Sequence, residues 1–164
     1  MVGLREFIDS DIKDLVRILN TPEVTYYLSS KIPNRYSLDD AKWWVTTGSK
    51  QALVRAIEFD GTLVGCIGIK PGVFEYARSG EIGYWLDKAY WGKGIVPLAV
   101  DAMLEVARTQ TDLVRIFATI FSGNSQSERV VAKAGFELEG RFKQAIFKHE
   151  RFFDAAIYAK IIRR

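Results

Sequence analysis

Apolar residues recur along this chain with two different spacings, one typical of helices and one typical of strands. Helical spacing predicts a first helix capped by Asp9 or Ser10, and further helices at 22–28, from Ser37 onward, at 96–108, and from Ser125 to Gly135. The apolar face of the first helix is formed by Ile12, Leu15, Val16 and Leu19. Runs of β-branched and aromatic residues predict strands at 2–8, 52–59, 62–70, 81–86, 113–121, 136–148 and 151–162.

Turn and cap residues mark several boundaries between these elements. Ser37 begins a helix with Asp40 three residues later, which is the spacing of a capping box. Asp60 and Gly61 separate two strands and favour a β-hairpin. The resulting order, βααα-ββ-β-α-β-α-ββ, predicts the α+β class with a single mixed sheet flanked by helices. Because the chain shows no repeats or linkers, residues 1–164 are expected to form one domain.

The most informative segment is Tyr90-Trp91-Gly92-Lys93-Gly94-Ile95-Val96, between the strand at 81–86 and the helix at 96–108. Its glycines let the backbone approach a ligand, and a helix start offers unpaired N–H groups and positive dipole charge. This combination is typical of a phosphate site. The dinucleotide fingerprint is excluded because Pro97 stands where a third glycine is required, and the chain has no P-loop sequence. A glycine-containing connection without a ligand is the alternative. The helix that follows is expected to place on one face Leu98, Ala99, Ala102, Met103 and Val106.

A second strand–helix unit follows the first. Asn124 or Ser125 can cap its helix, with Glu128 placed to close a capping box on Ser125. Gly135 is expected to end that helix. Two such units in succession suggest neighbouring strands with both helix starts at one end of the sheet.

These two segments resemble the GNAT family of N-acetyltransferases, and within it the RimJ/RimL-like ribosomal-protein acetyltransferases. The loop W-G-K-G-I-A of that group is matched by residues 91–96 except at Val96, which is bulkier than the usual residue. The motif N-x-x-S-x-x-V-x-x-K-x-G-F is matched in full by residues 124–136. The resemblance implies the GNAT fold, in which two parallel strands, here 81–86 and 113–121, splay apart to hold the cofactor.

The resemblance also implies acetyl-coenzyme A (acetyl-CoA) as the co-substrate. Its diphosphate is expected on the backbone amides of residues 92–96, and its pantetheine arm along the strand edge at 84–86. Asn124 offers a donor and an acceptor to that arm, although helix capping alone also accounts for it. The expected cofactor-binding residues are Tyr84, Trp85, Leu86, Trp91, Gly92, Lys93, Gly94, Ile95, Val96, Asn124 and Ser127.

In this chemistry a neutral amine attacks the thioester directly. Ser127 matches the serine proposed in the RimJ/RimL-like group to protonate or hydrogen-bond the leaving thiolate; a helix-surface serine is the alternative. The group's expected glutamate base is replaced here by Ile146. Glu81 is therefore the candidate base, because strand alternation puts it on the face of Gly83 and Trp85. An ion-paired carboxylate at the strand edge is the alternative for Glu81.

The acceptor is expected to be a primary amine, and the RimJ/RimL resemblance favours a protein N-terminal α-amine. A small-molecule acetyltransferase for polyamines, antibiotics or amino sugars is an alternative within catalysis. Val96 and Ile146 also leave open a non-catalytic CoA-binding regulatory module. The sequence does not decide the oligomeric state, and a homodimer remains an alternative.

Composition narrows the class further. Hydrophobic residues make up 48% and charged residues 26% of the 164 residues, and no apolar run is long enough to span a membrane. The charged residues Arg5 and Glu6 near the start make a signal peptide unexpected. Cys66 is interpreted as a buried small hydrophobe, which fits the cytoplasm. The net charge of +3 comes without a basic stripe or a nucleic-acid motif, so direct nucleic-acid binding is not expected. His149 is expected in a surface turn, and without Cys/His clusters no metal site is expected.

Overall fold

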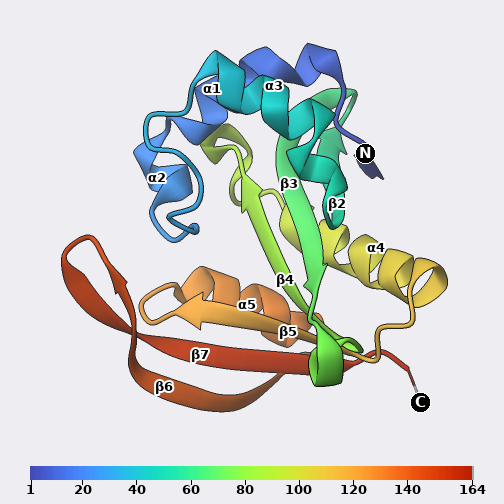
Figure 1. Ribbon diagram of the computed structural model, residues 1–164, viewed down its shortest axis with the longest axis vertical. Coiled ribbons are helices and arrows are strands. Elements are labelled where there is room, and N and C mark those ends of the chain that lie inside the picture. Colours follow the sequence, from blue (N-terminus) through green and yellow to red (C-terminus); the bar gives the residue numbers. More distant parts are fainter. Residues whose placement is uncertain (164) are drawn as a thin grey trace. The chain divides into compact units, whose positions relative to one another are not determined.

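The computed structural model describes residues 1–163, and its elements follow the predicted order (Figure 1). The strands are β1 Val2–Arg5, β2 Leu53–Phe59, β3 Thr62–Pro71, β4 Ser79–Leu86, β5 Arg115–Phe121, β6 Glu137–Lys148 and β7 Arg151–Ile161. The helices are α1 Ile12–Leu19, α2 Pro22–Thr25, α3 Leu38–Thr46, α4 Ile95–Gln110 and α5 Ser125–Lys133, with short 3₁₀ turns between some elements.

The strands form one sheet in the order β1-β2-β3-β4-β5-β7-β6. β4 and β5 run parallel, with Ser79 opposite Arg115 and Glu81 opposite Phe117, whereas β1 with β2, β5 with β7, and β6 with β7 are antiparallel. The predicted α+β class with a single mixed sheet is therefore confirmed. The splaying of β4 from β5 beyond these paired residues stays a prediction.

The contacts divide the chain into two compact units, which are described separately. The first unit contains Met1–Gly68 and Tyr84–Ala99, and the second contains Ile69–Gly83 and Val100–Arg164. Strands β3 and β4 and helix α4 continue from one unit into the other. The single-domain interpretation stays a prediction.

The core of the first unit is formed by residues of α1, α2, α3, β2 and β3, together with Phe7, Tyr36 and Trp85. Leu15 and Leu19 are buried on the predicted face of α1, and Ile12 and Val16 pack partly buried against the same cluster. At the start of α3 the predicted capping box forms, because the Asp40 amide donates to Ser37 Oγ at 3.0 Å and the Ser37 amide donates to Asp40 Oδ2 at 2.8 Å.

The chain ahead of α1 differs from its prediction. β1 ends at Arg5 instead of continuing to residue 8, and α1 begins at Ile12 after a 3₁₀ turn at Asp9–Asp11. The reason is Asp11, which is 3% exposed and accepts hydrogen bonds from the Ile8 amide at 2.9 Å and from Arg5 at 2.8 and 2.9 Å. Asp11 therefore forms the local cap on the Ile8 amide and pairs with Arg5, six residues away, in place of the cap expected at Asp9 or Ser10. α2 is also shorter than predicted and ends at Thr25.

Helix α4 buries only part of the predicted face, because Ala99 and Met103 are buried and Val106 is half-buried. Leu98 is 57% exposed, and Ala102 is also exposed. The buried residues are Ile95, Ala99, Val100, Met103, Leu104 and Ala107. The buried face is thus rotated away from Leu98 and Ala102, which helical spacing alone could not fix.

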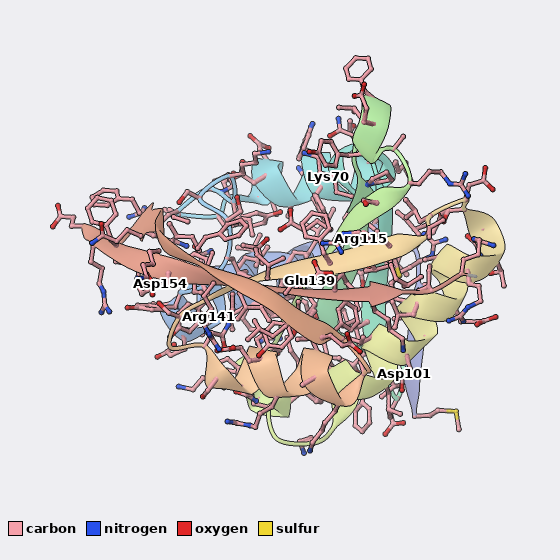
Figure 2. The ribbon with its side chains drawn as sticks, turned by 90° about the horizontal axis from the view of Figure 1, so that it is seen from below. Lys70, Asp101, Arg115, Glu139, Arg141 and Asp154 are labelled. Carbon is pink, nitrogen blue, oxygen red and sulfur yellow. The ribbon has the colours of Figure 1, made fainter. Side chains whose placement is uncertain are left out.

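The second unit contains the β6–β7 hairpin and α5. Gly135 follows α5 with a φ of 89°, so it ends the helix as predicted, and His149 lies in the β6–β7 turn as predicted, with a φ of 55°. β6 shifts register against β7 between Leu138 and Gly140 and again between Phe142 and Ile146. In Figure 2, Arg115 and Glu139 lie close together, and the guanidinium of Arg115 donates to both carboxylate oxygens of Glu139 at 2.6 and 2.8 Å.

Within residues 1–163, no helix combines the length and the hydropathy needed to cross a membrane.

Candidate active site

The turn after β4 is fixed by Asp87, which is 5% exposed in the first unit. Its amide donates to the Val64 carbonyl at 2.7 Å, so the end of β4 is tied to β3. Its carboxylate accepts from the Ala89 amide at 3.1 Å and from Arg17 Nη2 at 2.8 Å. The hydrogen bond with Asp87 raises the pKa of Arg17. Asp87 therefore holds the entrance of the glycine loop.

Trp91 also holds the glycine loop between β4 and α4 in place. The indole Nε1–H donates to the Leu86 carbonyl at 2.9 Å, and the Trp91 amide donates to the Lys88 carbonyl at 3.2 Å. Because Leu86 is the last residue of β4, the indole folds the loop back over the end of this strand. The ring remains 40% exposed.

Gly92 and Gly94 shape the exposed part of the loop. Their φ angles are 76° and 74°, a conformation that side chains other than glycine rarely adopt. A Cβ built on either glycine would meet no atom within 4 Å, so both border open space. Among residues 1–163, no group accepts a hydrogen bond from the amides of Gly92, Lys93 or Gly94. Lys93 is exposed, with no salt bridge to any described residue.

These loop amides meet the beginning of α4. Ile95, the first helical residue, is 2% exposed, and Val96 is half-buried, so the helix start is fixed by packing. Unpaired amides at a helix start carry positive partial charge, and glycines at alternate positions can turn several amides toward one anion. The loop therefore has the chemistry of an anion site.

The end of β4 depends on a glycine that sequence reasoning missed. Trp85 and Leu86 are 9% and 8% exposed, and Tyr84 is half-buried. A Cβ on Gly65 of β3 would lie 2.4 Å from the Trp85 carbonyl oxygen. Gly65 thus permits the close approach of β3 to this part of β4. A glycine within the apolar run at 63–69 is the only signal the sequence offers for it.

In the second unit, Asn124 caps α5. Its side-chain oxygen accepts from the Ser127 amide at 3.4 Å, and its own amide donates to the Phe121 carbonyl at 3.1 Å. Asn124 and Ser127 are both half-buried. The capping prediction is confirmed for Asn124, and the capping function accounts for this side chain without requiring a ligand.

Glu128 does not close the predicted capping box. Its carboxylate instead accepts from the Tyr158 hydroxyl at 2.8 Å and from Arg141 Nη2 at 2.8 Å. Burial and this bond to the carboxylate raise the pKa of Tyr158. Glu128 therefore joins the first turn of α5 to β6 and β7. The partners lie 13 and 30 residues away in the chain, so local spacing carried no signal for them.

Glu81 is exposed on β4, and it belongs to the second unit. Exposure alternates as predicted through Ile82 and Gly83, but Trp85 is buried, so the alternation does not extend to it. No cation among residues 1–163 lies within salt-bridge distance of the Glu81 carboxylate. The ion-paired alternative is thus not observed in the described part of the chain.

The predicted site residues fall into two groups. The first unit holds Tyr84, Trp85, Leu86, Trp91, Gly92, Lys93, Gly94, Ile95 and Val96. The second unit holds Glu81, Asn124 and Ser127. Ile146 is half-buried on β6, opposite Phe153. Among residues 1–163, no three His, Cys, Asp or Glu side chains come close enough together to hold a metal ion.

A family comparison identifies the chain. Residues 2–137 match the family model described as "Acetyltransferase (GNAT) domain". The chain belongs to the GNAT acetyltransferase family. The predictions of this family and of an acyl-CoA-dependent acetyltransferase are therefore confirmed.

Relatives within the GNAT family agree with this assignment. The uncharacterized N-acetyltransferase YnaD of Bacillus subtilis (strain 168) is 38% identical over 159 residues, which cover 95% of this chain and 91% of YnaD. The ribosomal-protein-serine acetyltransferase of Escherichia coli (strain K12) is 38% identical over 85 residues, or 52% of this chain and only 48% of that relative. The solved structure of Mycobacterium smegmatis RimJ in complex with CoA-disulfide has a TM-score of 0.85 and 26% identity, covering 98% of this chain and 81% of RimJ. The RimJ/RimL-like resemblance is thereby confirmed.

Proposed function

We propose that this GNAT protein transfers the acetyl group of acetyl-CoA to the N-terminal α-amine of a protein. The observation that carries the proposal is the loop at Gly92–Gly94 before α4, whose amides have no acceptor in the described part of the chain. The CoA group in the RimJ structure supports the cofactor, and the ribosomal-protein-serine acetyltransferase supports the acceptor class.

In this proposal the two phosphates of CoA bind the amides of residues 92–96, and Lys93 adds a positive charge beside them. Pro97 contributes no amide because it has no N–H. The pantetheine arm pairs with the backbone of β4 at Tyr84, Trp85 and Leu86, in the manner of an added strand. Asn124 binds the same arm while it caps α5.

The chemistry requires one proton to pass from the amine to the sulfur. The amine lone pair attacks the thioester carbon, a C–N bond forms, and the resulting oxyanion collapses with cleavage of the C–S bond. The products are an amide and the free thiol of CoA. Because an α-amine has a pKa of about 7.7–8.0, much of it is already neutral near pH 8. A weak base such as the Glu81 carboxylate, acting directly or through water, then suffices.

Ser127 is proposed to donate a hydrogen bond to the departing thiolate. Its position in the first turn of α5 is fixed from both sides, by the Asn124 cap and by the neighbouring Glu128 with its bonds to Arg141 and Tyr158. A serine hydroxyl is a weak acid, so its contribution is stabilisation of developing negative charge on sulfur.

The test is release of free CoA thiol from acetyl-CoA in the presence of peptides. We expect turnover with a free N-terminal serine or alanine peptide, and none with the same peptide acetylated at its N-terminus. A peptide whose only amine is a lysine side chain should react far more slowly, because its pKa of about 10.4 leaves little neutral amine. A polyamine or amino sugar that outperforms every peptide would overturn the acceptor assignment.

Ser127→Ala tests the proposed mechanism, with Ser125→Ala as its matched control because Ser125 is exposed in the same helical turn. We expect kcat to fall at least about tenfold for Ser127→Ala with little change in KM for acetyl-CoA, since the hydrogen bond is made in the transition state. Equal kcat values for the two variants would remove Ser127 from the mechanism.

A further inference from the structure

In the second unit, the chain leaves β5 for α5 through a tight turn at residues 121–124. The Asn124 amide donates to the Phe121 carbonyl at 3.1 Å, which closes a four-residue turn. Gly123, at the third position, has a φ of 93°, and a type II turn requires a positive φ there. Ser122 holds the second position, directly after the last residue of β5. This turn therefore determines where α5 begins.

Ser122 is bound twice to Asp154 of β7, which is labelled in Figure 2. The Ser122 amide donates to the Asp154 carbonyl at 2.9 Å, and the Ser122 hydroxyl accepts from the Asp154 amide at 3.0 Å. In a hydrogen-bonded pair of an antiparallel ladder, the two residues exchange two backbone bonds. Here the hydroxyl of Ser122 takes the place of its carbonyl in the second bond. The backbone can therefore turn away from β7 while Ser122 stays attached to that strand.

Asp154 is itself held by β6. The register shift between Phe142 and Ile146 places residues 143–145 of β6 opposite Asp154 alone. In the middle of this bulge, Gln144 has a φ of 52°, and its amide donates to Asp154 Oδ1 at 2.9 Å. Bulges re-aim the chain at defined places, and this one is tied to the neighbouring strand by a carboxylate. Asp154 thus joins the bulge of β6 to the turn before α5.

Aromatic packing holds the same corner of the second unit. Phe121 and Phe153, the neighbours of Ser122 and Asp154 in the chain, meet edge to face with ring centroids 5.3 Å apart. Phe153 is buried. Because this packing does not involve the Ser122 hydroxyl, loss of that hydroxyl should change the position of the turn without unfolding the unit.

Ser127 stands at the other end of this series of contacts. Its amide donates to the Asn124 side chain at 3.4 Å, and Asn124 is also the residue whose amide closes the turn. The cap bond is longer than the usual range of about 2.7–3.2 Å for N–H···O bonds. The position of Ser127 therefore depends on how firmly the turn ahead of the cap is held.

We infer that Ser122 is a positioning residue for acetyl transfer. Its two bonds to Asp154 fix the turn at residues 121–124, the turn fixes Asn124, and Asn124 fixes the first turn of α5 with Ser127. The inference rests on the function proposed above for Ser127 at the departing sulfur. A displacement of about 1 Å at a reacting group can cost about a hundredfold in rate, so a hydroxyl two contacts away can control kcat.

The experiment compares initial rates of CoA-thiol release for Ser122→Ala and Ser122→Thr, with the amine acceptor that the wild-type protein uses fastest. We expect kcat of Ser122→Ala to fall about fivefold, with KM for acetyl-CoA changed by less than about twofold, because the glycine loop contains none of these residues. Ser122→Thr keeps the hydroxyl and should keep the wild-type kcat. So should the control Ser125→Ala, whose serine is exposed. A wild-type kcat for Ser122→Ala, or a lower melting temperature as its only change, would overturn the inference.

A double variant shows whether Ser122 acts through Ser127. We expect Ser122→Ala combined with Ser127→Ala to have the kcat of Ser127→Ala alone, within about twofold, because a residue that only places Ser127 Oγ has no effect once that atom is removed. A further fivefold decrease, of about the size seen for Ser122→Ala alone, would show that Ser122 acts by another route and would also overturn the inference.

Amide hydrogen exchange, followed by NMR without acetyl-CoA, separates a failure of this inference from a failure of the proposed function, because exchange needs no turnover. In Ser122→Ala the amides of Asn124 and Ser127 should exchange about fivefold faster than in the wild type, whereas that of Ala134, at the far end of α5, should be unchanged. If those amides exchange faster while Ser127→Ala keeps the wild-type kcat, the catalytic role of Ser127 fails and the placement of α5 by Ser122 stands. Unchanged exchange of both amides would refute that placement whatever the kinetics show.

Discussion

Replacing Gly94 by alanine is the sharpest test of the glycine loop. With a φ of 74°, alanine at this position adopts a left-handed conformation that costs about 1–2 kcal/mol of unfolding free energy. No clash adds to this cost, because the new Cβ meets no atom within 4 Å. For a chain of 164 residues, each kcal/mol lowers the melting temperature by about 2–4 °C, so we expect a decrease of roughly 2–8 °C.

The same methyl group projects into the open space where the diphosphate is proposed to bind. We therefore expect KM for acetyl-CoA to rise about tenfold, the equivalent of about 1.4 kcal/mol, while kcat changes little. Gly61→Ala is the matched control, because Gly61 has a φ of 83°, borders equally open space and lies in the β2–β3 turn. Thermal unfolding and initial-rate kinetics of both variants give the comparison. If the two variants lose similar stability and show the same KM, the loop does not bind the cofactor.

Three further predictions concern charge and burial. Burial raises the pKa of the Cys66 thiol to about 12, so its thiolate fraction at pH 8 is about one in ten thousand. A thiol reagent should therefore label Cys66 only as the protein unfolds. Rapid labelling of the native protein would contradict this burial. Asp11→Ala leaves the half-buried guanidinium of Arg5 without its bidentate partner. We expect urea denaturation to show an unfolding free energy lower by about 3 kcal/mol. A loss below about 1 kcal/mol would show that the pair contributes little. The hydrogen bonds from Arg115 lower the pKa of Glu139. The difference in unfolding free energy between wild type and Glu139→Gln should therefore be constant above about pH 4.3 and shrink as the pH falls through the lowered pKa of Glu139. A difference that persists unchanged at about pH 2 would refute the ion pair as its cause.

Local chemistry predicted those parts of the fold that depend on neighbours in the chain. Ser37 with Asp40, and Asp60 with Gly61, form the cap and the hairpin that their spacing indicated, because the interacting groups are three residues or fewer apart. The glycine loop was identifiable for the same reason. One glycine on each side of Lys93, directly before an apolar helix, specifies a backbone geometry with little help from the rest of the chain.

Tertiary partners decided the features that the sequence did not reveal. Glu128 was predicted to close a local capping box on Ser125, yet its carboxylate binds Arg141 and Tyr158 instead. A carboxylate with two strong donors gains more than one at a helix end, and no local pattern indicates where those donors come from. The buried face of α4 was predicted only in part, because Leu98 and Ala102 lie beside Ala99 and Met103 on the helix and helical spacing alone does not fix where the buried face ends.

The sheet ends at β6, a strand of twelve residues whose outer backbone groups could pair with another molecule. Two register shifts and the φ of 52° at Gln144 interrupt its regularity, and its side chains include Glu137, Arg141 and Lys143. Irregular, charged edge strands resist pairing with a strand of another molecule, because a regular strand can match their hydrogen-bond register over only a few residues. The β6–β7 hairpin can therefore leave β6 as a long exposed edge strand and still protect the protein against fibre-like self-association at high concentration.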